Sequence, residues 1–165
     1  ADINLADKRS YTPLHYAITN GHTAITKHLL TNQADHRLAT KEGLTALHLV
    51  AEKRHSSDLK MLNILLPYVA SADINLADKR SYTPLHYAIT NGHTAITKHL
   101  LTNQADHRLA TKEGLTALHL VAEKRHSSDL KMLNILLPYV ASSDINRQDK
   151  EGDTPLHEAC QTGNS

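Results

Sequence analysis

The chain has 165 residues, with a hydrophobic fraction of 40% and a charged fraction of 21%, which excludes a disordered chain and suffices for one domain or a short array. Its 18 lysines and arginines nearly balance its 17 aspartates and glutamates, so the charge supports neither a nucleic-acid partner nor an anionic membrane. No apolar run approaches the roughly 20 residues that a bilayer span needs, and we expect no membrane partner.

The sequence contains a long exact repeat, and shorter repeats lie within it. Residues 1–71 recur without a single difference as residues 72–142. Surface positions of a repeat array tolerate substitution within about 0.5 kcal/mol, so two copies under ordinary mutation would diverge there first. Their identity leaves a very recent duplication, a homogenising process, or one segment joined to itself in the laboratory, and we favour the last.

The first predicted element is a helix of about two turns that begins at Pro13. Thr12 can cap the unpaired amides of its first turn, and Pro13 suits the first helical position because it has no amide of its own. An apolar stripe with helical spacing follows over residues 14–18, and the Asn-Gly pair at residues 20–21 offers a left-handed stop.

A second helix is predicted from the same spacing over residues 25–30, antiparallel to the first because the connecting turn is short. Later in each copy, a longer turn precedes a helix over Leu59–Leu66. Ser57 or Asp58 is the natural cap of that helix, and Pro67 is expected to end it.

A short motif stands at the start of the first helix in each predicted helix pair. Thr-Pro-Leu-His-x-Ala stands at residues 12–17, 83–88 and 154–159, and Thr-Ala-Leu-His begins at Thr45 and Thr116. These motifs resemble the ankyrin repeat. The resemblance implies an all-α solenoid of antiparallel helix pairs with β-hairpin-like loops. Within a single solenoid over residues 1–165, we expect the end of a preceding repeat at 1–6, repeats at 7–39, 40–77, 78–110 and 111–148, and a partial repeat at 149–165.

The histidine of each motif has a structural role by the same resemblance, which implies that it ties adjacent loops through hydrogen bonds to the backbone. These histidines are His15, His48, His86, His119 and His157. The remaining histidines lack the close spacing of a metal motif, so we predict no metal and no cofactor. A zinc site assembled across the copies is the alternative that this leaves open.

Catalysis is not supported by any motif. The chain has no glycine-rich phosphate loop and no nucleophile elbow, and Cys160 lacks the histidine and carboxylate context of an active nucleophile. We expect Cys160 to be a partly buried structural thiol. The chain is therefore predicted not to be an enzyme.

The resemblance implies a non-catalytic protein-protein interaction scaffold that docks a protein or peptide on a concave surface of loop tips and first-helix faces. Tyr11 and Tyr82, beside lysine and arginine, are the best candidates for hot spots. The alternative is an engineered structural repeat protein with no dedicated partner. The predicted binding residues are Lys8, Arg9, Tyr11, Thr19, Asn20, Lys41, Glu42, Leu44, Glu52, Lys53, Lys79, Arg80, Tyr82, Thr90, Asn91, Lys112, Glu113, Leu115, Glu123 and Lys124.

The two ends of the array are expected to associate with other copies of the chain, because an outer repeat leaves one apolar flank without a neighbour. Leu14 and Ile25 would form that flank at the beginning of the chain, and Leu156 would lack a second helix at its end. We therefore expect weak end-to-end self-association. No secretory leader opens the sequence, which favours an intracellular protein of the cytoplasm or nucleus.

Overall fold

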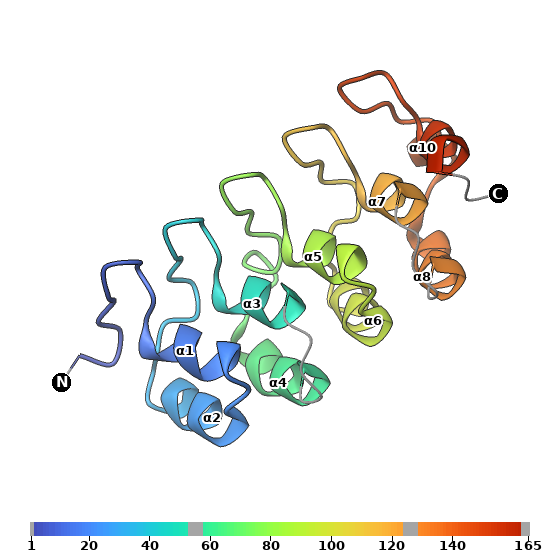
Figure 1. Cartoon of the computed structure of the whole chain (residues 1–165). Coiled ribbons are helices and arrows are strands. Elements are labelled where there is room, and N and C mark those ends of the chain that lie inside the picture. The colour runs from blue at the N-terminus through green and yellow to red at the C-terminus, as the bar shows by residue number, and fades with distance from the viewer. Residues whose placement is uncertain (1, 53–57, 124–128, 163–165) are drawn as a thin grey trace.

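The computed structural model describes residues 2–52, 58–123 and 129–162, and within these ranges it contains helices and no strand. Short helices form pairs that stand side by side in one row, with the two termini at opposite ends (Figure 1). The α-helices are α1 (Pro13–Thr19), α2 (Thr23–Thr31), α3 (Ala46–Glu52), α4 (Asp58–Leu65), α5 (Pro84–Thr90), α6 (Thr94–Thr102), α7 (Ala117–Glu123), α8 (Asp129–Leu136), α9 (Ser142–Ile145) and α10 (Pro155–Thr162), and 3-10 turns follow α4 and α8 as η1 (Leu66–Tyr68) and η2 (Leu137–Tyr139).

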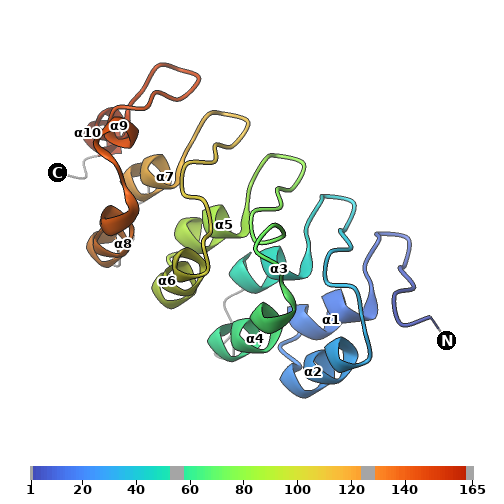
Figure 2. The same cartoon turned by 180° about the vertical axis from the view of Figure 1, so that it is seen from behind.

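The helices form two rows, which confirms the all-α solenoid. The first helices α1, α3, α5, α7 and α10 each contact the next in that order, and the second helices α2, α4, α6 and α8 do the same. Figure 2 shows the second row beneath the first, with the loops extending from one edge of the stack. Since a helix pair of this size cannot bury its apolar face alone, neighbouring pairs share one continuous core, which runs from Leu14 to Leu136.

The predicted start of the first helix is confirmed. Thr12 Oγ1 accepts from the His15 amide at 3.4 Å, and His15 Nδ1 accepts from the Thr12 amide at 2.9 Å, which closes a capping box around Pro13. Gly21 has a φ of 71°, the left-handed conformation expected after α1. The same geometry recurs in the second copy at α5.

Four of the five motif histidines tie adjacent loops together, as the resemblance implies. Because Nδ1 accepts the threonine amide, the proton of the neutral ring lies on Nε2, which donates to a carbonyl of the following loop. His157 caps its own helix through Thr154 and is exposed. The inter-loop bonds run from His15 to Leu38 O, His48 to Tyr82 O and His86 to Leu109 O, all at 2.9 Å, and from His119 to Asp153 O at 3.0 Å.

The second helix of the longer repeats ends slightly earlier than predicted. Helix α4 stops at Leu65, and the chain continues as a 3-10 turn that includes Pro67, because proline cannot donate the next helical bond. Of the two residues predicted to cap it, Asp58 is the first residue of α4, and Ser57 lies outside the described residues.

The identical copies place the same residues in different environments. Ile25 at the first repeat is 52% exposed, whereas its copy Ile96 is 3% exposed because the preceding repeat covers it. The prediction that Leu14 forms part of the exposed flank is wrong. Leu14 is buried in the shared core, since α1 packs against both α2 and α3. The flank thus belongs to Ile25 and not to Leu14.

The last described helix lacks the cover that earlier first helices have. Leu156 of α10 is 70% exposed, in agreement with the expectation for this end. The prediction that Cys160 is partly buried is wrong, because its thiol is exposed on the same helix. Within the described residues no second helix follows α10 to bury that side.

Successive loops approach each other closely at two glycines. A Cβ added to Gly43 would lie 2.9 Å from the Lys79 amide nitrogen, and one added to Gly114 would lie 2.9 Å from that of Lys150. Gly152 has the same left-handed backbone, with a φ of 85°, but a Cβ there would meet nothing within 4 Å.

Gly43→Ala is therefore expected to destabilise the fold more than Gly152→Ala. Both substitutions strain a left-handed backbone, at roughly 1–2 kcal/mol, but only the first also pushes on the neighbouring loop. Urea unfolding followed by circular dichroism measures both, and we expect the Gly43 variant to lose about 1–2 kcal/mol more. Equal losses would mean that the loops do not approach as the structure shows.

Candidate functional site

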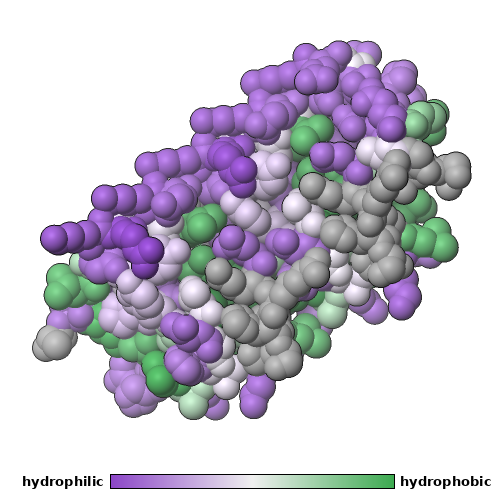
Figure 3. All heavy atoms as spheres, in the orientation of Figure 1, coloured by the Kyte–Doolittle hydropathy of each residue, from purple (hydrophilic) through white to green (hydrophobic). Residues whose placement is uncertain are grey.

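Each repeat presents a loop tip with two exposed charged side chains at its end. We call this row the loop-tip ridge. The space-filling view shows strongly hydrophilic residues along the loop edge of the molecule (Figure 3). Its members are Lys8 and Arg9, Lys41 and Glu42, Lys79 and Arg80, Lys112 and Glu113, and Lys150 and Glu151, all of them exposed.

An aspartate at the base shapes the loops that carry arginine. Asp7 Oδ1 accepts from the amides of Arg9 and Tyr11, both at 2.9 Å, and the Asp7 amide donates to the Tyr11 carbonyl at 2.9 Å. Hydrogen bonds from the Tyr16 hydroxyl and from the Tyr11 amide lower the pKa of Asp7. The aspartate is thus an ionised acceptor that binds amides of its own loop and the hydroxyl of Tyr16 on α1.

Backbone hydrogen bonds join each loop tip to the next. The amides of Lys41, Lys79, Lys112 and Lys150 donate to the carbonyls of Arg9, Glu42, Arg80 and Glu113, over 3.3, 3.0, 3.2 and 3.0 Å respectively. Together with the histidine bonds, these contacts hold the tips in a fixed register. The side chains of the ridge are therefore displayed from an ordered backbone.

The arginine of the third loop is held over an aromatic ring. The Arg80 guanidinium carbon lies 4.7 Å from the centre of the Tyr82 ring, and Arg80 Nη2 donates to the Tyr87 hydroxyl at 3.4 Å. Tyr87 in turn donates to Asp78 Oδ2 at 2.5 Å. Burial, helped by the hydrogen bond with Asp78, raises the pKa of Tyr87 to about 12, so the phenol stays a donor.

The structure brings several predicted binding residues together. Tyr11 is half-buried, and burial and the nearby carboxylates of Glu42 and Glu52 raise its pKa. Its copy Tyr82 is likewise half-buried, and burial and Glu113 raise its pKa, with Glu123 and Asp78 acting in the same direction. Loop tips and first-helix faces thus meet around these tyrosines.

Other predicted residues are placed differently. Leu44 does not belong to the surface: it is 8% exposed and packs in the core, because the glycine loop turns this side chain inward. Its copy Leu115 is half-buried.

Asn20 and Asn91 each donate through the side chain to a carbonyl of the preceding helix, to Tyr16 O and Tyr87 O, and so help to end α1 and α5. Of the remaining predictions, Thr19 and Thr90 are half-buried, and Lys53 and Lys124 lie outside the described residues.

Sequence reasoning missed the residues that position the arginines. Asp78 and Tyr87 join the arginine loop to the first helix, nine positions apart, and the same pair recurs as Asp7 and Tyr16. No short motif links residues at that spacing. Their recurrence in both copies gives no signal either, because every residue of the first 71 recurs in the second copy.

A separate group of carboxylates lies at the last loop. Oxygen atoms of Asp149, Asp153 and Glu158 lie within 4.8 Å of one another, and this is the one group of metal-ligand types found in the described part of the chain. Burial and the hydrogen bond with Asp149 raise the pKa of Glu158. Gln161 also donates to Asp153, at 3.1 Å, so the cluster is partly satisfied by the protein itself.

A hollow of about 350 Å³ lies on the other side of the stack, between η1 and the end of α6. Its lining includes Leu66, Ile74 and Gln104 and contains no histidine, carboxylate or amine, so it offers no acid or base and nothing to activate the hydroxyls of Ser71 and Thr102. No described helix is long and apolar enough to cross a membrane.

Comparison with known proteins identifies the repeats. The family described as ankyrin repeats (3 copies) matches residues 1–77, 55–138 and 96–165. The chain is 32% identical over 165 residues to Inversin of Canis lupus familiaris and of Homo sapiens, covering 99% of this chain and 15% of theirs. It is 29% identical over 163 residues to the nuclear factor NF-kappa-B p105 subunit of Gallus gallus, covering 98% of this chain and 16% of that protein. The chain therefore spans about a sixth of these relatives.

Proposed function

The chain belongs to the ankyrin-repeat family, and from this premise we propose that it is a non-catalytic scaffold that docks a protein or peptide partner. Ankyrin repeats mediate protein-protein interactions, and the family is typically non-catalytic. The docking surface is the loop-tip ridge together with Tyr11, Tyr82 and the adjoining first-helix faces. An intracellular location, in the cytoplasm or nucleus, is part of this proposal.

The observation that carries the proposal is the register of the loops. Backbone hydrogen bonds connect every tip to the next, so little conformational freedom remains to be lost when a partner binds. The half-buried tyrosines add rigid contact area beside exposed cations, which is the composition of interface hot spots. The surface therefore offers both ordered backbone and residues suited to recognition.

Site-specific photo-crosslinking tests this proposal. A photoreactive amino acid at position 79 on the ridge is compared with one at position 98 on α6, where the native lysine is exposed on the second-helix row. We expect position 79 to capture a defined protein that unlabelled chain competes away, and position 98 to capture none. Capture of the same proteins at both positions would contradict a ridge-specific partner.

The alternative, a structural repeat protein without a dedicated partner, is favoured by the identity of residues 1–71 and 72–142. A chain selected for a particular partner would be expected to vary its two ridge segments independently. The same crosslinking experiment separates the two functions, because a purely structural array yields no competed adduct at position 79.

Self-association through the ends is also expected for this 165-residue chain. Ile25 is 52% exposed at one end and Leu130 is 71% exposed at the other, and both offer apolar surface to a second copy. Light scattering should show an apparent mass that rises with concentration and falls for the Ile25→Lys/Leu130→Lys double variant. A constant monomer mass at high concentration would rule this association out.

A further inference from the structure

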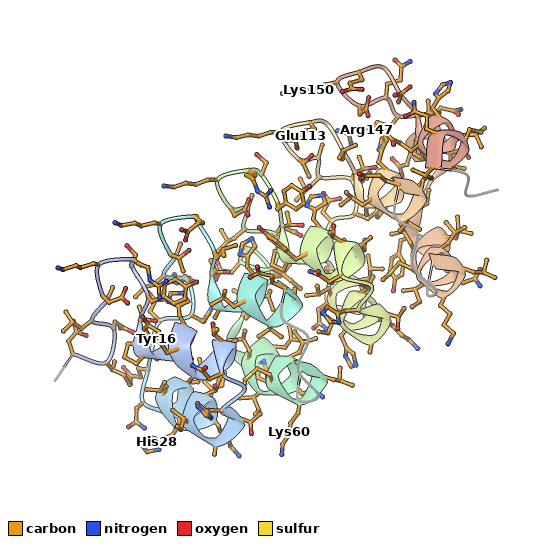
Figure 4. The ribbon with its side chains drawn as sticks, viewed as in Figure 1. Tyr16, His28, Lys60, Glu113, Arg147 and Lys150 are labelled. Carbon is orange, nitrogen blue, oxygen red and sulfur yellow. The ribbon has the colours of Figure 1, made fainter. Side chains whose placement is uncertain are left out.

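Every loop tip carries a lysine at the same position, whereas the residue that follows it changes. Figure 4 shows nitrogen-ended side chains extending in one direction from successive loops, with Lys150 labelled at the last of them. The following residue alternates between arginine and glutamate over the first four tips. The constant lysines are Lys8, Lys41, Lys79, Lys112 and Lys150, all exposed.

The spacing of these lysines is set by the fold. First helices that pack side by side lie about 8–10 Å apart, and the backbone bonds between loops keep the tips in step with them. A polyproline-II helix rises about 3.1 Å per residue with three residues per turn, so every third side chain points the same way about 9 Å further on. The spacing of the loop-tip lysines therefore matches the three-residue repeat of a polyproline-II helix.

The arginines of the first and third loops add carboxylate-binding groups between lysines. Arg9 and Arg80 lie over the rings of Tyr11 and Tyr82, at 5.2 and 4.7 Å from the ring centres. Both guanidinium groups are on exposed residues, so part of each planar fork faces solvent. Their orientation is fixed in advance, which suits paired hydrogen bonds to a carboxylate.

We propose that the loop-tip ridge binds an extended, polyproline-II-like peptide that carries an acidic side chain at every third residue. Its carboxylates lie opposite Lys8, Lys41, Lys79 and Lys112. This inference rests on the proposed function, since it names the chemistry of the partner at the same surface.

The carboxylates of the ridge favour a peptide over a nucleic acid. Glu42 and Glu113 follow every second lysine, and the Thr40 hydrogen bond, with Lys79 and Arg9 nearby, lowers the pKa of Glu42, so it is charged. A single-stranded nucleic acid carries a phosphate at each nucleotide and would meet these carboxylates. A peptide places neutral residues at the intervening positions and avoids the repulsion.

The acidic group at the last loop limits the site to four tips. Lys150 is followed by Glu151, and Asp149, Asp153 and Glu158 gather behind it. Asp149, like Asp7 and Asp78, accepts from two backbone amides of its own loop, but Asp153 and Glu158 stand where the arginine loops have tyrosines, so extra carboxylates are added only here. The cationic stretch therefore runs from Lys8 to Lys112.

Fluorescence anisotropy with three labelled peptides tests the inference on the whole chain. The first contains four Glu-Pro-Pro units, the second has the same composition with its glutamates in two adjacent pairs, and the third replaces each glutamate with lysine. We expect the first to bind about tenfold more tightly than the second, because only one spacing engages all four tips. The third should not bind.

A charge-matched pair of variants shows where the peptide binds. Lys41→Gln/Lys79→Gln/Lys112→Gln removes three ridge lysines, and Lys27→Gln/Lys98→Gln/Lys131→Gln removes three exposed lysines from the second helices. In Figure 4, Lys60 of α4, the first-copy counterpart of Lys131, extends from the second-helix row and away from the loop tips. We expect the ridge variant to lose about tenfold in affinity and the second-helix variant less than twofold.

Three outcomes would overturn the inference: equal affinity for the two glutamate peptides, equal loss in the two triple variants, or tighter binding of a labelled oligo-dT of the same length. If any of these occurs while crosslinking at position 79 still captures a competed protein, the acidic partner is wrong and the proposed function stands. If crosslinking at position 79 also captures no competed protein, both the acidic partner and the proposed function are wrong.

Discussion

Ile96→Ala is expected to lower the free energy of unfolding by about 2–4 kcal/mol, whereas Ile25→Ala should cost about 1 kcal/mol or less. The two isoleucines occupy the same position of identical 71-residue segments, so their local sequence and helix propensity are the same. Ile96 is 3% exposed and would leave a cavity between repeats, while Ile25 is 52% exposed and would leave none. The difference between the variants therefore measures the contact with the preceding repeat.

Urea unfolding followed by circular dichroism and fitted with a nearest-neighbour repeat model gives both values. Such a fit is needed because a repeat array can unfold in parts, so a single two-state free energy is not well defined. Equal losses for the two variants would show that the repeats do not share a core. The size of the difference also reports the strength of one inter-repeat interface.

Stability is expected to fall as the pH decreases from 7 to 5, mainly because of the buried motif histidines. Burial lowers the pKa of His86 to about 4, and burial also lowers the pKa values of His15 and His48. At His86 the unfolded chain takes up a proton near pH 6.5, and the folded chain does so only near pH 4. The stabilisation of the fold by the neutral, buried ring is thus complete above pH 6.5 and is lost as the pH falls toward 4.

For His86 this amounts to about 3 kcal/mol in total, of which about 2 kcal/mol is lost between pH 7 and 5. Burial is the main cause, and the bond from the Thr83 amide to His86 Nδ1 also favours the neutral ring, because a protonated ring cannot accept it. The carboxylates with lowered pKa values, such as Asp7 and Glu42, act mainly below pH 5 and leave this window to the histidines.

Comparing His86→Gln with the parent chain at pH 7 and pH 5 checks this prediction. The variant should be destabilised at pH 7, and the penalty should shrink by about 2 kcal/mol at pH 5. Ile96→Ala serves as the control, because its penalty involves no proton and should be the same at both pH values. A His86→Gln penalty that is independent of pH would contradict a neutral, buried imidazole.

The repeat architecture could be predicted from the sequence because its signals are local. Thr12, Pro13 and Gly21 fix the beginning and end of a helix within ten residues, and the structure has them in those roles. The motif histidines followed from the family resemblance, and their bonds to neighbouring loops are present. Propensity, capping and turn chemistry were sufficient at this level.

The environment of a side chain could not be predicted in the same way. Leu44 and Tyr11 occupy the same position of the motif, yet the leucine lies in the core and the tyrosine is half-buried beside the ridge. Leu14 and Cys160 were misplaced because their exposure depends on which neighbouring helices cover them. Packing between helices of different repeats, such as α1 against α3, decides these cases.

Distances between spin labels measure most directly whether the loop tips form a rigid, evenly spaced row. In a Cys160→Ser background, one label at position 8 is paired in turn with a second label at position 112 or 150. Steps of about 8–10 Å per repeat predict narrow distributions near about 24–30 Å and 32–40 Å. Broad distributions, or equal distances for the two pairs, would contradict the row of tips on which the proposed binding surface depends.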